Sequence, residues 1–163
     1  MTDRAADTRW LRRAIELATQ SVAAAGGPFG AVIVREGSLV AVGQNSVTRD
    51  LDPSAHAEVV AIRTACRTLD DFALEGCTLY SSCEPCPMCL AASLWARLDR
   101  VVYAADRNDA ARGGFDDLAF YELFGGGRAA DHDDWPTTVE ELPIEGRSAP
   151  FEAWAAKSDR TGY

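Results

Sequence analysis

The sequence predicts an α/β fold in which helices are layered on a partly parallel sheet. In the second half of the chain, strand-like stretches alternate with helix-like stretches, a pattern typical of parallel strands joined through helices. In the first half, two apolar stretches separated by a short glycine-containing loop indicate a hairpin. The 163 residues, 47% of them apolar, suffice for one hydrophobic core and show no internal repeat. We therefore expect a single domain over residues 1–163.

The first element is predicted to be a helix from Thr8 to about Ala24. Its apolar residues are four, three and four positions apart, which places them on one helical stripe: Leu11, Ile15, Ala18 and Val22. Asp7 or Thr8 is expected to accept hydrogen bonds from the first amide groups of this helix, and Gly26-Gly27-Pro28 is expected to stop it.

The remaining elements follow from the same patterns and from the positions of proline and glycine. Glu36-Gly37-Ser38 is expected to form a three-residue hairpin loop, and Pro87 to lie in the first turn of a helix. In chain order we predict strands at Phe29–Arg35 and Leu39–Asn45, a helix from about Ala55 to Leu69, a strand at Cys77–Ser82, a helix at Pro87–Leu98, a strand at Arg100–Ala105, a helix at Asp116–Phe124, a short strand near Val139–Leu142 and an amphipathic segment at Pro150–Lys157. The acidic, turn-rich stretch 128–163 is interpreted as a C-terminal tail.

Charge and cysteine content limit the classes of function. Twenty-five Asp and Glu against sixteen Lys and Arg give a net charge of −9, which disfavours electrostatic capture of nucleic acid. The longest uncharged run, 17–34, contains polar and turn residues and is not expected to span a membrane. No apolar stretch follows Met1, and an odd number of cysteines, five, favours a reducing compartment. We expect a cytoplasmic protein that binds neither nucleic acid nor membrane.

Three residues have the types and spacing of a metal site: His56, Cys86 and Cys89. The cysteines are three positions apart at a predicted helix start, so both sulfurs lie on one face and the positive helix end favours their thiolates. Two thiolates balance the charge of Zn²⁺, and a neutral imidazole is the third ligand. The fourth position is left for water, whose pKa zinc lowers from 15.7 toward roughly 7, which gives a hydroxide at neutral pH. We predict a catalytic zinc ion in each subunit.

Glu58 is the predicted catalytic acid–base. It lies two residues beyond His56, on the first turn of the same helix, where its carboxylate can take a proton from the water and return it to a leaving amine. The pattern H-x-E followed by P-C-x-x-C is typical of zinc-dependent deaminases that act on nucleobases.

Other interpretations of these residues compete with a catalytic zinc. Cys83 as a fourth ligand would make the site a closed structural zinc site, and a redox pair of Cys86 and Cys89 would give His56-Ala57-Glu58 no role. The other candidates are interpreted as structural residues: Cys66 and Cys77 in the core, and His132 in a solvated loop.

Segments beyond the predicted ligands carry a resemblance to a known family. These segments are Gly27–Val34, Gly43–Asn45, Asp52–Glu58, Ser82–Cys89, Trp95–Arg97, Asp109–Asp117, Pro150–Trp154 and the terminal Tyr163. They resemble the cytidine-deaminase-like superfamily and, within it, the bacterial guanine deaminases. The resemblance covers most of the chain from Trp10 onward and is loosest between Gly125 and Ala149.

The resemblance implies a fold, a reaction and an assembly. The fold would be a three-layer α/β/α arrangement with a mixed five-stranded sheet flanked by helices. The reaction would be hydrolytic deamination of guanine to xanthine and ammonia, a step of purine catabolism, with zinc-bound hydroxide attacking C2. The assembly would be a homodimer whose subunits exchange their C-terminal segments, roughly residues 128–163, so that each tail closes the partner's pocket.

Guanine as the substrate gives roles to several further residues. A carboxylate such as Asp117 could accept hydrogen bonds from both N1–H and the 2-amino group, with Asp116 as an equal alternative and Glu122 as a weaker one. Asn45 could donate and accept at the other edge of the purine. We also expect Phe29 or Phe115 to stack on the purine ring and Ala57 to contact it. The resemblance alone implies that Tyr163 closes the pocket over the substrate. From the residues alone, Asp116 and Asp117 would instead be a helix N-cap and a solvated neighbour.

Three other functions are weighed against guanine deamination. Guanosine or another amino-substituted ring could be the substrate, because spacing does not show whether the tail leaves room for ribose. A tRNA adenosine deaminase shares the zinc motif, but residues 106–145 hold eleven acidic residues against three arginines, which disfavours RNA. A non-catalytic, zinc-stabilised binding module would keep the metal and have no use for Glu58.

Overall fold

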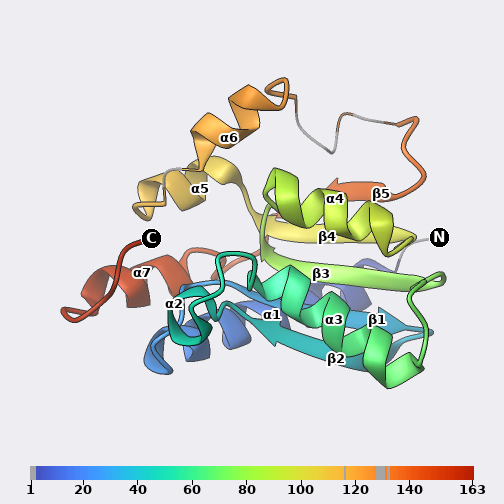
Figure 1. The fold of residues 1–163 in the computed structure, drawn as a ribbon, viewed down its shortest axis with the longest axis horizontal. Coiled ribbons are helices and arrows are strands. Elements are labelled where there is room, and N and C mark those ends of the chain that lie inside the picture. The colour runs from blue at the N-terminus through green and yellow to red at the C-terminus, as the bar shows by residue number, and fades with distance from the viewer. Residues whose placement is uncertain (1–2, 116, 128–130, 132) are drawn as a thin grey trace.

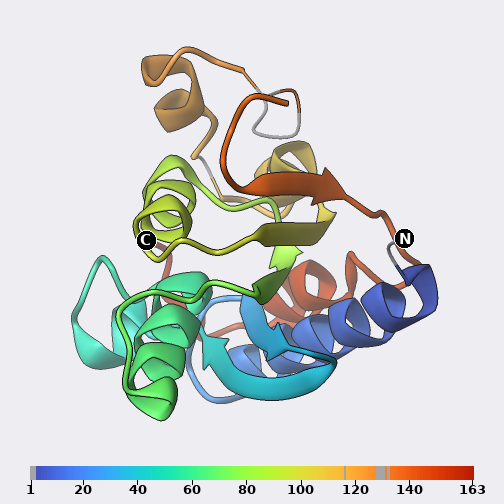
Figure 2. The same ribbon diagram turned by 90° about the vertical axis from the view of Figure 1, so that its right-hand side faces the viewer.

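A five-stranded mixed sheet lies between two layers of helices in the computed structural model, which describes residues 3–115, 117–127, 131 and 133–163 (Figures 1 and 2). The helices are α1 (Arg4–Ala23), α2 (Val47–Asp50), α3 (Ala57–Leu69), α4 (Pro87–Trp95), α5 (Arg107–Arg112), α6 (Leu118–Leu123) and α7 (Ala149–Ala156). The strands are β1 (Gly30–Arg35), β2 (Ser38–Gln44), β3 (Cys77–Cys83), β4 (Arg100–Ala105) and β5 (Thr138–Glu141). Helices α1 and α7 cover one face, and α3 and α4 cover the other. The predicted three-layer α/β/α fold is confirmed.

The strand order is β2-β1-β3-β4-β5, and the pairing changes direction once across the sheet. Strand β1 pairs antiparallel with both β2 and β3, whereas β3, β4 and β5 run parallel. The parallel pairing predicted for the second half of the chain is therefore confirmed. Because β3 and β4 are parallel, their carboxyl ends meet at one edge of the sheet, where such folds place their ligands.

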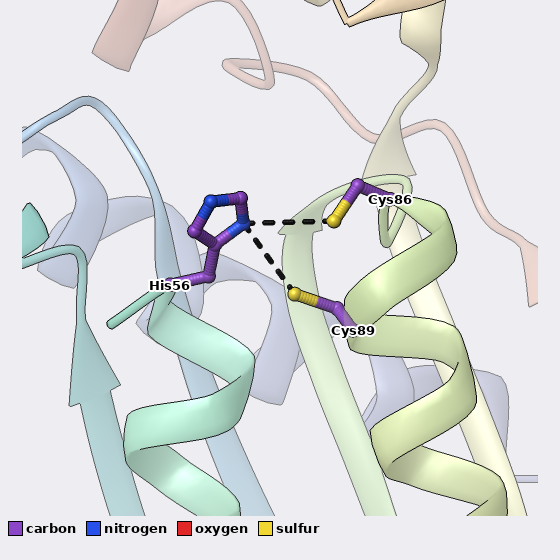
Figure 3. Close-up of side chains that lie close together, drawn as sticks. All are labelled: His56, Cys86 and Cys89. Atoms are coloured by element: carbon purple, nitrogen blue, oxygen red, sulfur yellow. Dashed lines mark hydrogen bonds between the residues drawn. The ribbon is translucent and has the colours of Figure 1, made fainter. Parts of the chain in front are cut away.

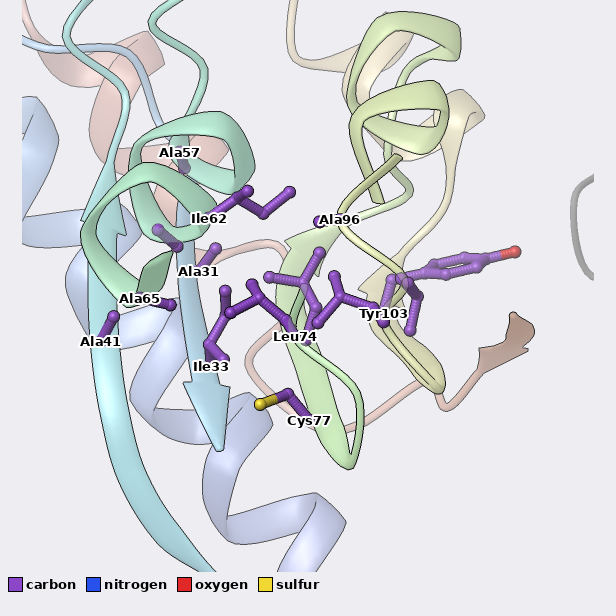
Figure 4. Close-up of a cluster of buried hydrophobic side chains, with 14 of the residues drawn as sticks. Ala31, Ile33, Ala41, Ala57, Ile62, Ala65, Leu74, Cys77, Ala96 and Tyr103 are labelled. Carbon is purple, nitrogen blue, oxygen red and sulfur yellow. The ribbon is translucent and has the colours of Figure 1, made fainter. Parts of the chain in front are cut away.

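Side chains of β1 alternate between two hydrophobic cores, one on each face of the sheet. Ala31 and Ile33 face the core under α3, together with the buried Cys77, while Val32 and Val34 face the core under α1 (Figure 4). A strand that is buried on both faces reads as a continuous apolar run, as this one does. The interpretation of Cys77 as a core residue is confirmed.

The hairpin loop contains two residues rather than the predicted three. Glu36 and Gly37 have φ values of +50° and +73°, while Ser38 already begins β2. Positive φ at both central residues is the geometry of the two-residue turn whose twist matches that of the flanking strands.

Other boundaries also differ from the predictions. Helix α3 begins at Ala57 rather than at Ala55, and α4 ends at Trp95 rather than Leu98, because Arg97 takes a left-handed conformation with φ +56°. The short helices α2 and α5 were not predicted, since each has too few residues to show a period. Asp116 and His132 lie outside the described residues. No helix in the described ranges is long and apolar enough to cross a lipid bilayer.

The predicted N-cap of the first helix is wrong, and Asp7 has a different role. Helix α1 begins at Arg4, and Asp3 caps it by accepting from the amides of Ala5 and Ala6. Asp7 is 4% exposed and accepts from both terminal nitrogens of Arg100 at 2.8 Å. It also accepts from the Tyr80 hydroxyl at 2.7 Å. The same Arg100, in β4, binds Glu140 of β5, so the network with Tyr80 ties α1 to three neighbouring strands, β3, β4 and β5.

Asp7→Asn is expected to lower the free energy of unfolding at pH 7 by about 3 kcal/mol, since it removes one partner of a buried ion pair. Hydrogen bonds from Arg100 lower the pKa of both Asp7 and Glu140. The two carboxylates therefore contribute fully to folding stability above their unfolded-state pKa values near 4. This contribution is lost as pH falls through their lower folded-state pKa values. Urea unfolding at pH 7, 5 and 3.5 measures this. The wild type should lose more stability on acidification than the variant, and equal losses would contradict the role of Asp7.

Candidate active site

The three predicted metal ligands lie at the starts of two helices that reach the same edge of the sheet. His56 is the N-cap of α3 and Cys86 is the N-cap of α4, and both have extended backbones, with ψ of 154° and 166°. Neither side chain makes a capping hydrogen bond, and the two side chains point toward each other (Figure 3). Cys89 follows one turn into α4 and is fully buried. Because α3 begins at Ala57, later than predicted, His56 stays outside the helix as its N-cap.

The ligand atoms form a compact donor set. The Nδ1 atom of His56 lies 3.6 Å from the sulfur of Cys86 and 3.5 Å from that of Cys89 (Figure 3). Among the described residues, no fourth His, Cys, Asp or Glu joins this group, whose ligand atoms all lie within 4.8 Å of one another. One imidazole nitrogen and two sulfurs are the donors that zinc prefers, and three protein ligands leave one tetrahedral position open for water or substrate.

The two cysteines hold one proton between them. A hydrogen bond from the Cys89 thiol, aided by His56, lowers the pKa of Cys86 to about 4. The same hydrogen bond raises the pKa of Cys89. Cys86 is thus a thiolate at neutral pH, the form that binds metals, and binding through both sulfurs releases the shared proton.

Cys83 does not complete a closed metal site. It ends β3, and its sulfur lies 3.7 Å from the carbonyl oxygen of Asp106. Burial raises the pKa of this thiol, which favours the neutral form. The four-ligand interpretation, with Cys83 as the fourth ligand, is therefore wrong for this arrangement.

Glu58 lies next to the ligand set on the first turn of α3. Its side chain is buried, with Oε1 accepting from the Ser81 hydroxyl at 3.2 Å and Oε2 lying 3.4 Å from the sulfur of Cys89. Burial, together with the nearby Cys86 thiolate, raises the pKa of Glu58. A raised carboxyl pKa suits a group that must both take and return a proton near neutral pH. The contact with Ser81 was not predicted, because no sequence motif links a single serine in a strand to a glutamate 23 positions away.

Asp117 has a buried oxygen that no described residue satisfies. It is the N-cap of α6, yet its side chain makes no capping hydrogen bond, and Oδ1 has no partner among the described residues. Burial and the nearby Cys86 thiolate raise the pKa of Asp117 to about 6. Asp117 thus occupies the N-cap position that the residues alone suggested, but its side chain does not cap the helix. Glu122 is exposed on the same helix and does not share this environment.

Aromatic and amide side chains surround the approach to these carboxylates. Asn45 is 1% exposed and its Oδ1 accepts from the amides of Gly27 and Val47. A Cβ on Gly27 would lie 1.9 Å from the Tyr163 hydroxyl and 3.2 Å from Cγ of Asn45, so only glycine lets these groups approach.

The aromatic rings lie together around the C-terminal residue. Phe29 packs edge-to-face on Phe115 at 4.9 Å between ring centroids, and Phe115 contacts Tyr163 at 5.8 Å. Ala57, between His56 and Glu58, is completely buried. Contacts thus connect Phe29 and Phe115 to Tyr163, and Tyr163 to Gly27 and Asn45, while Ala57 lies in the chain between His56 and Glu58.

Comparisons with known proteins agree with this arrangement. The family model for the cytidine and deoxycytidylate deaminase zinc-binding region matches residues 4–105. A guanine deaminase of Bacillus subtilis is 46% identical over 160 residues, covering 94% of this chain and 97% of that protein. The X-ray structure of guanine deaminase from Bacillus subtilis superimposes with a TM-score of 0.71 at 44% identity, covering 100% of this chain and 99% of that one.

A tRNA-specific adenosine deaminase of Aquifex aeolicus is also similar, but over a shorter stretch. It is 47% identical over 78 residues, which are 48% of this chain and 52% of that protein. The likeness to the guanine deaminase extends over nearly the whole chain.

Proposed function

The chain belongs to the cytidine and deoxycytidylate deaminase zinc-binding family, and on this basis we propose that it hydrolyses guanine to xanthine and ammonia. Likeness to a guanine deaminase over nearly the whole chain carries this proposal. The open His56–Cys86–Cys89 donor set next to a buried carboxylate is what hydrolysis of an amino-substituted ring requires. The reaction belongs to purine catabolism, and we propose that it takes place in the cytoplasm.

Glu58 carries the protons of the reaction. Zinc held by the three ligands would supply a Lewis acid that lowers the pKa of a water in the open position. Glu58 accepts a proton from the attacking water while the water oxygen bonds to C2 of guanine. Glu58 then donates this proton to the amino nitrogen. The C2–N bond breaks, ammonia leaves, and the carboxylate is restored for the next cycle. Ser81 holds the other carboxylate oxygen of Glu58 in place.

Base recognition is assigned to polar groups on opposite edges of the ring. Asp117 accepts from N1–H and the 2-amino group, and its buried Oδ1, which has no partner within the described residues, supports this role. Asn45 contacts the other edge of the purine. The remaining assignments are apolar or closing contacts: Phe29 against the ring, Ala57 under it, and Tyr163 over it.

Ammonia release from guanine, guanosine, adenine and cytosine tests the substrate. Guanine is expected to react fastest, because a site that hydrogen-bonds its substrate rejects analogues that lack the matching groups. Faster release from guanosine would identify a nucleoside deaminase. Faster release from adenine or cytosine would overturn the assignment.

We further propose a homodimer in which the C-terminal segments are exchanged. In the described chain α7 packs on α1, and Tyr163 lies beside Gly27 and Asn45. Large apolar side chains on α6 and at its C-cap are exposed, and a partner would cover them: Phe120, Leu123 and Phe124. Two glycines with positive φ, Gly125 and Gly126, follow the helix. Exchange would place the partner's Tyr163 over each site.

A mixture of two inactive variants tests the exchange. One parent carries Glu58→Gln, and the other lacks residues 150–163. In an exchanged hybrid dimer, one site receives an intact Glu58 and an intact tail, so activity is expected to reappear after the two are refolded together. If each tail closed its own subunit, no site would be complete and the mixture would stay inactive. Light scattering on the wild type, expected to report a dimer, is the control.

A further inference from the structure

Arg107, the first residue of α5, forms a buried ion pair with Glu84 in the loop before Cys86. The Glu84 carboxylate accepts from the backbone amide of Arg107 at 3.0 Å, from Nε at 3.1 Å and from Nη2 at 2.5 Å. The two side chains are 1% and 11% exposed. Such a shielded, multiply hydrogen-bonded pair holds its partners in a fixed orientation. Glu84, two residues before the predicted ligand Cys86, thus fixes the position of Arg107.

The same guanidinium also holds the segment that follows Asp117. Its Cζ lies 3.8 Å from the centroid of the Tyr121 ring, and its terminal nitrogens donate to the carbonyl groups of Gly126 and Gly127 at 3.5 and 3.3 Å. The Tyr121 amide in turn donates to the carbonyl oxygen of Asp117 at 3.4 Å. Arg107 therefore contacts the segment that follows α6 and the Tyr121 ring, which lies one turn beyond Asp117.

Within the part of the chain that the structure describes, α6 is anchored mainly through Tyr121. Tyr121 is its single buried residue, and its hydroxyl donates to the Glu84 carbonyl oxygen at 3.3 Å. Large apolar residues on the opposite side of the helix are exposed. The position of Asp117 relative to the metal ligands thus depends on the group formed by Glu84, Arg107 and Tyr121, which we call the clamp.

We propose that Arg107 is a positioning residue for base recognition, which fixes the Asp117 carboxylate at the distance from the metal ligands that the purine requires. This inference rests on the proposed function. Arg107 contacts neither the predicted ligands nor the predicted substrate-binding side chains, so its effect is on binding of the base through Asp117 and not on proton transfer by Glu58.

A double-mutant cycle between Arg107 and Asp117 tests the proposal. Arg107→Met is expected to raise the KM for guanine roughly 10- to 100-fold, the cost of a misplaced charge-assisted hydrogen bond. The expected kcat stays within about threefold of the wild-type value, since transition-state chemistry is retained. In an Asp117→Ala background the same change should have no further effect on KM. Arg107→Lys, which keeps the charge opposite Glu84, should restore part of the affinity.

Arg107→Met leaves the buried Glu84 carboxylate without its partner, which can prevent folding. Variants of Tyr121 test the proposal in that case, because they keep the ion pair. Tyr121→Leu removes the ring and the hydroxyl and leaves the ion pair, so it should raise KM, while Tyr121→Phe keeps the ring, loses only the hydrogen bond to Glu84 and should raise KM less. Arg112→Met, an exposed arginine of the same helix, is the matched control and should not change KM. Metal content is measured for every variant and should match that of the wild type.

Three outcomes would overturn the role of Arg107: an unchanged KM, an equal rise in KM in the Asp117→Ala background, or a loss of metal and kcat without a change in KM. The last would identify a purely structural pair. Wild-type protein that releases no ammonia from guanine would instead overturn the proposed function, so the two failures are distinguishable.

Discussion

Glu58→Gln is expected to lower kcat for guanine by about 100- to 10,000-fold, the contribution of a positioned acid–base group. Glutamine has nearly the same shape and can still accept from the Ser81 hydroxyl. It cannot accept the proton of the attacking water or return it to the amino nitrogen, so both proton transfers lose their carrier. Metal content and thermal unfolding temperature should stay close to those of the wild type. Ammonia release, metal analysis and calorimetry on one preparation measure all three.

The matched control for this change is Glu75→Gln, which alters an exposed glutamate far from the ligands and should leave kcat unchanged. If Glu58→Gln retains wild-type turnover, another group carries the proton and the mechanism is wrong. If it loses its metal instead, Glu58 is a structural support, as in a zinc-stabilised binding module. The two failures differ in the metal assay.

The donor set could be predicted from the sequence because its geometry is local. Cys86 and Cys89 are three positions apart at one helix start, which fixes that their sulfurs share a face, and His56 and Glu58 lie two positions apart at another helix start. The fold then has only to bring two helix starts to one sheet edge. The alternation of strands and helices after residue 55 predicted that arrangement correctly.

Contacts between distant residues could not be predicted in the same way. Asp7 was assigned to a helix cap because an acid near a helix start favours that role, whereas its partner Arg100 is 93 positions away. The clamp joins Arg107 to Glu84 across 23 positions, and neither residue belongs to a periodic pattern. Choosing among the acidic candidates near α6 likewise required burial, which separates Asp117 from the exposed Glu122.

Cys86→Ser is expected to abolish both metal binding and guanine deamination. The Cys86 thiolate is one of only two anionic ligands in the predicted set, and a neutral hydroxyl neither balances the charge of the ion nor matches its preference for sulfur. Loss of a direct ligand should weaken metal affinity by more than the roughly 10- to 100-fold effect of removing a supporting group. Metal analysis by mass spectrometry should find about one zinc ion per wild-type chain and almost none in the variant.

Cys83→Ser is the matched control, because it makes the same chemical change three residues earlier in the chain. The Cys83 sulfur faces the Asp106 carbonyl oxygen, and a serine hydroxyl can donate to that oxygen in its place. This variant should therefore keep its metal and its activity. A strong chelator should inactivate the wild type and Cys83→Ser alike, and added Zn²⁺ should restore both but not Cys86→Ser. Equal metal loss in both serine variants would mean that Cys83 completes a closed four-ligand site, in which no position is left for water and the hydrolytic mechanism fails.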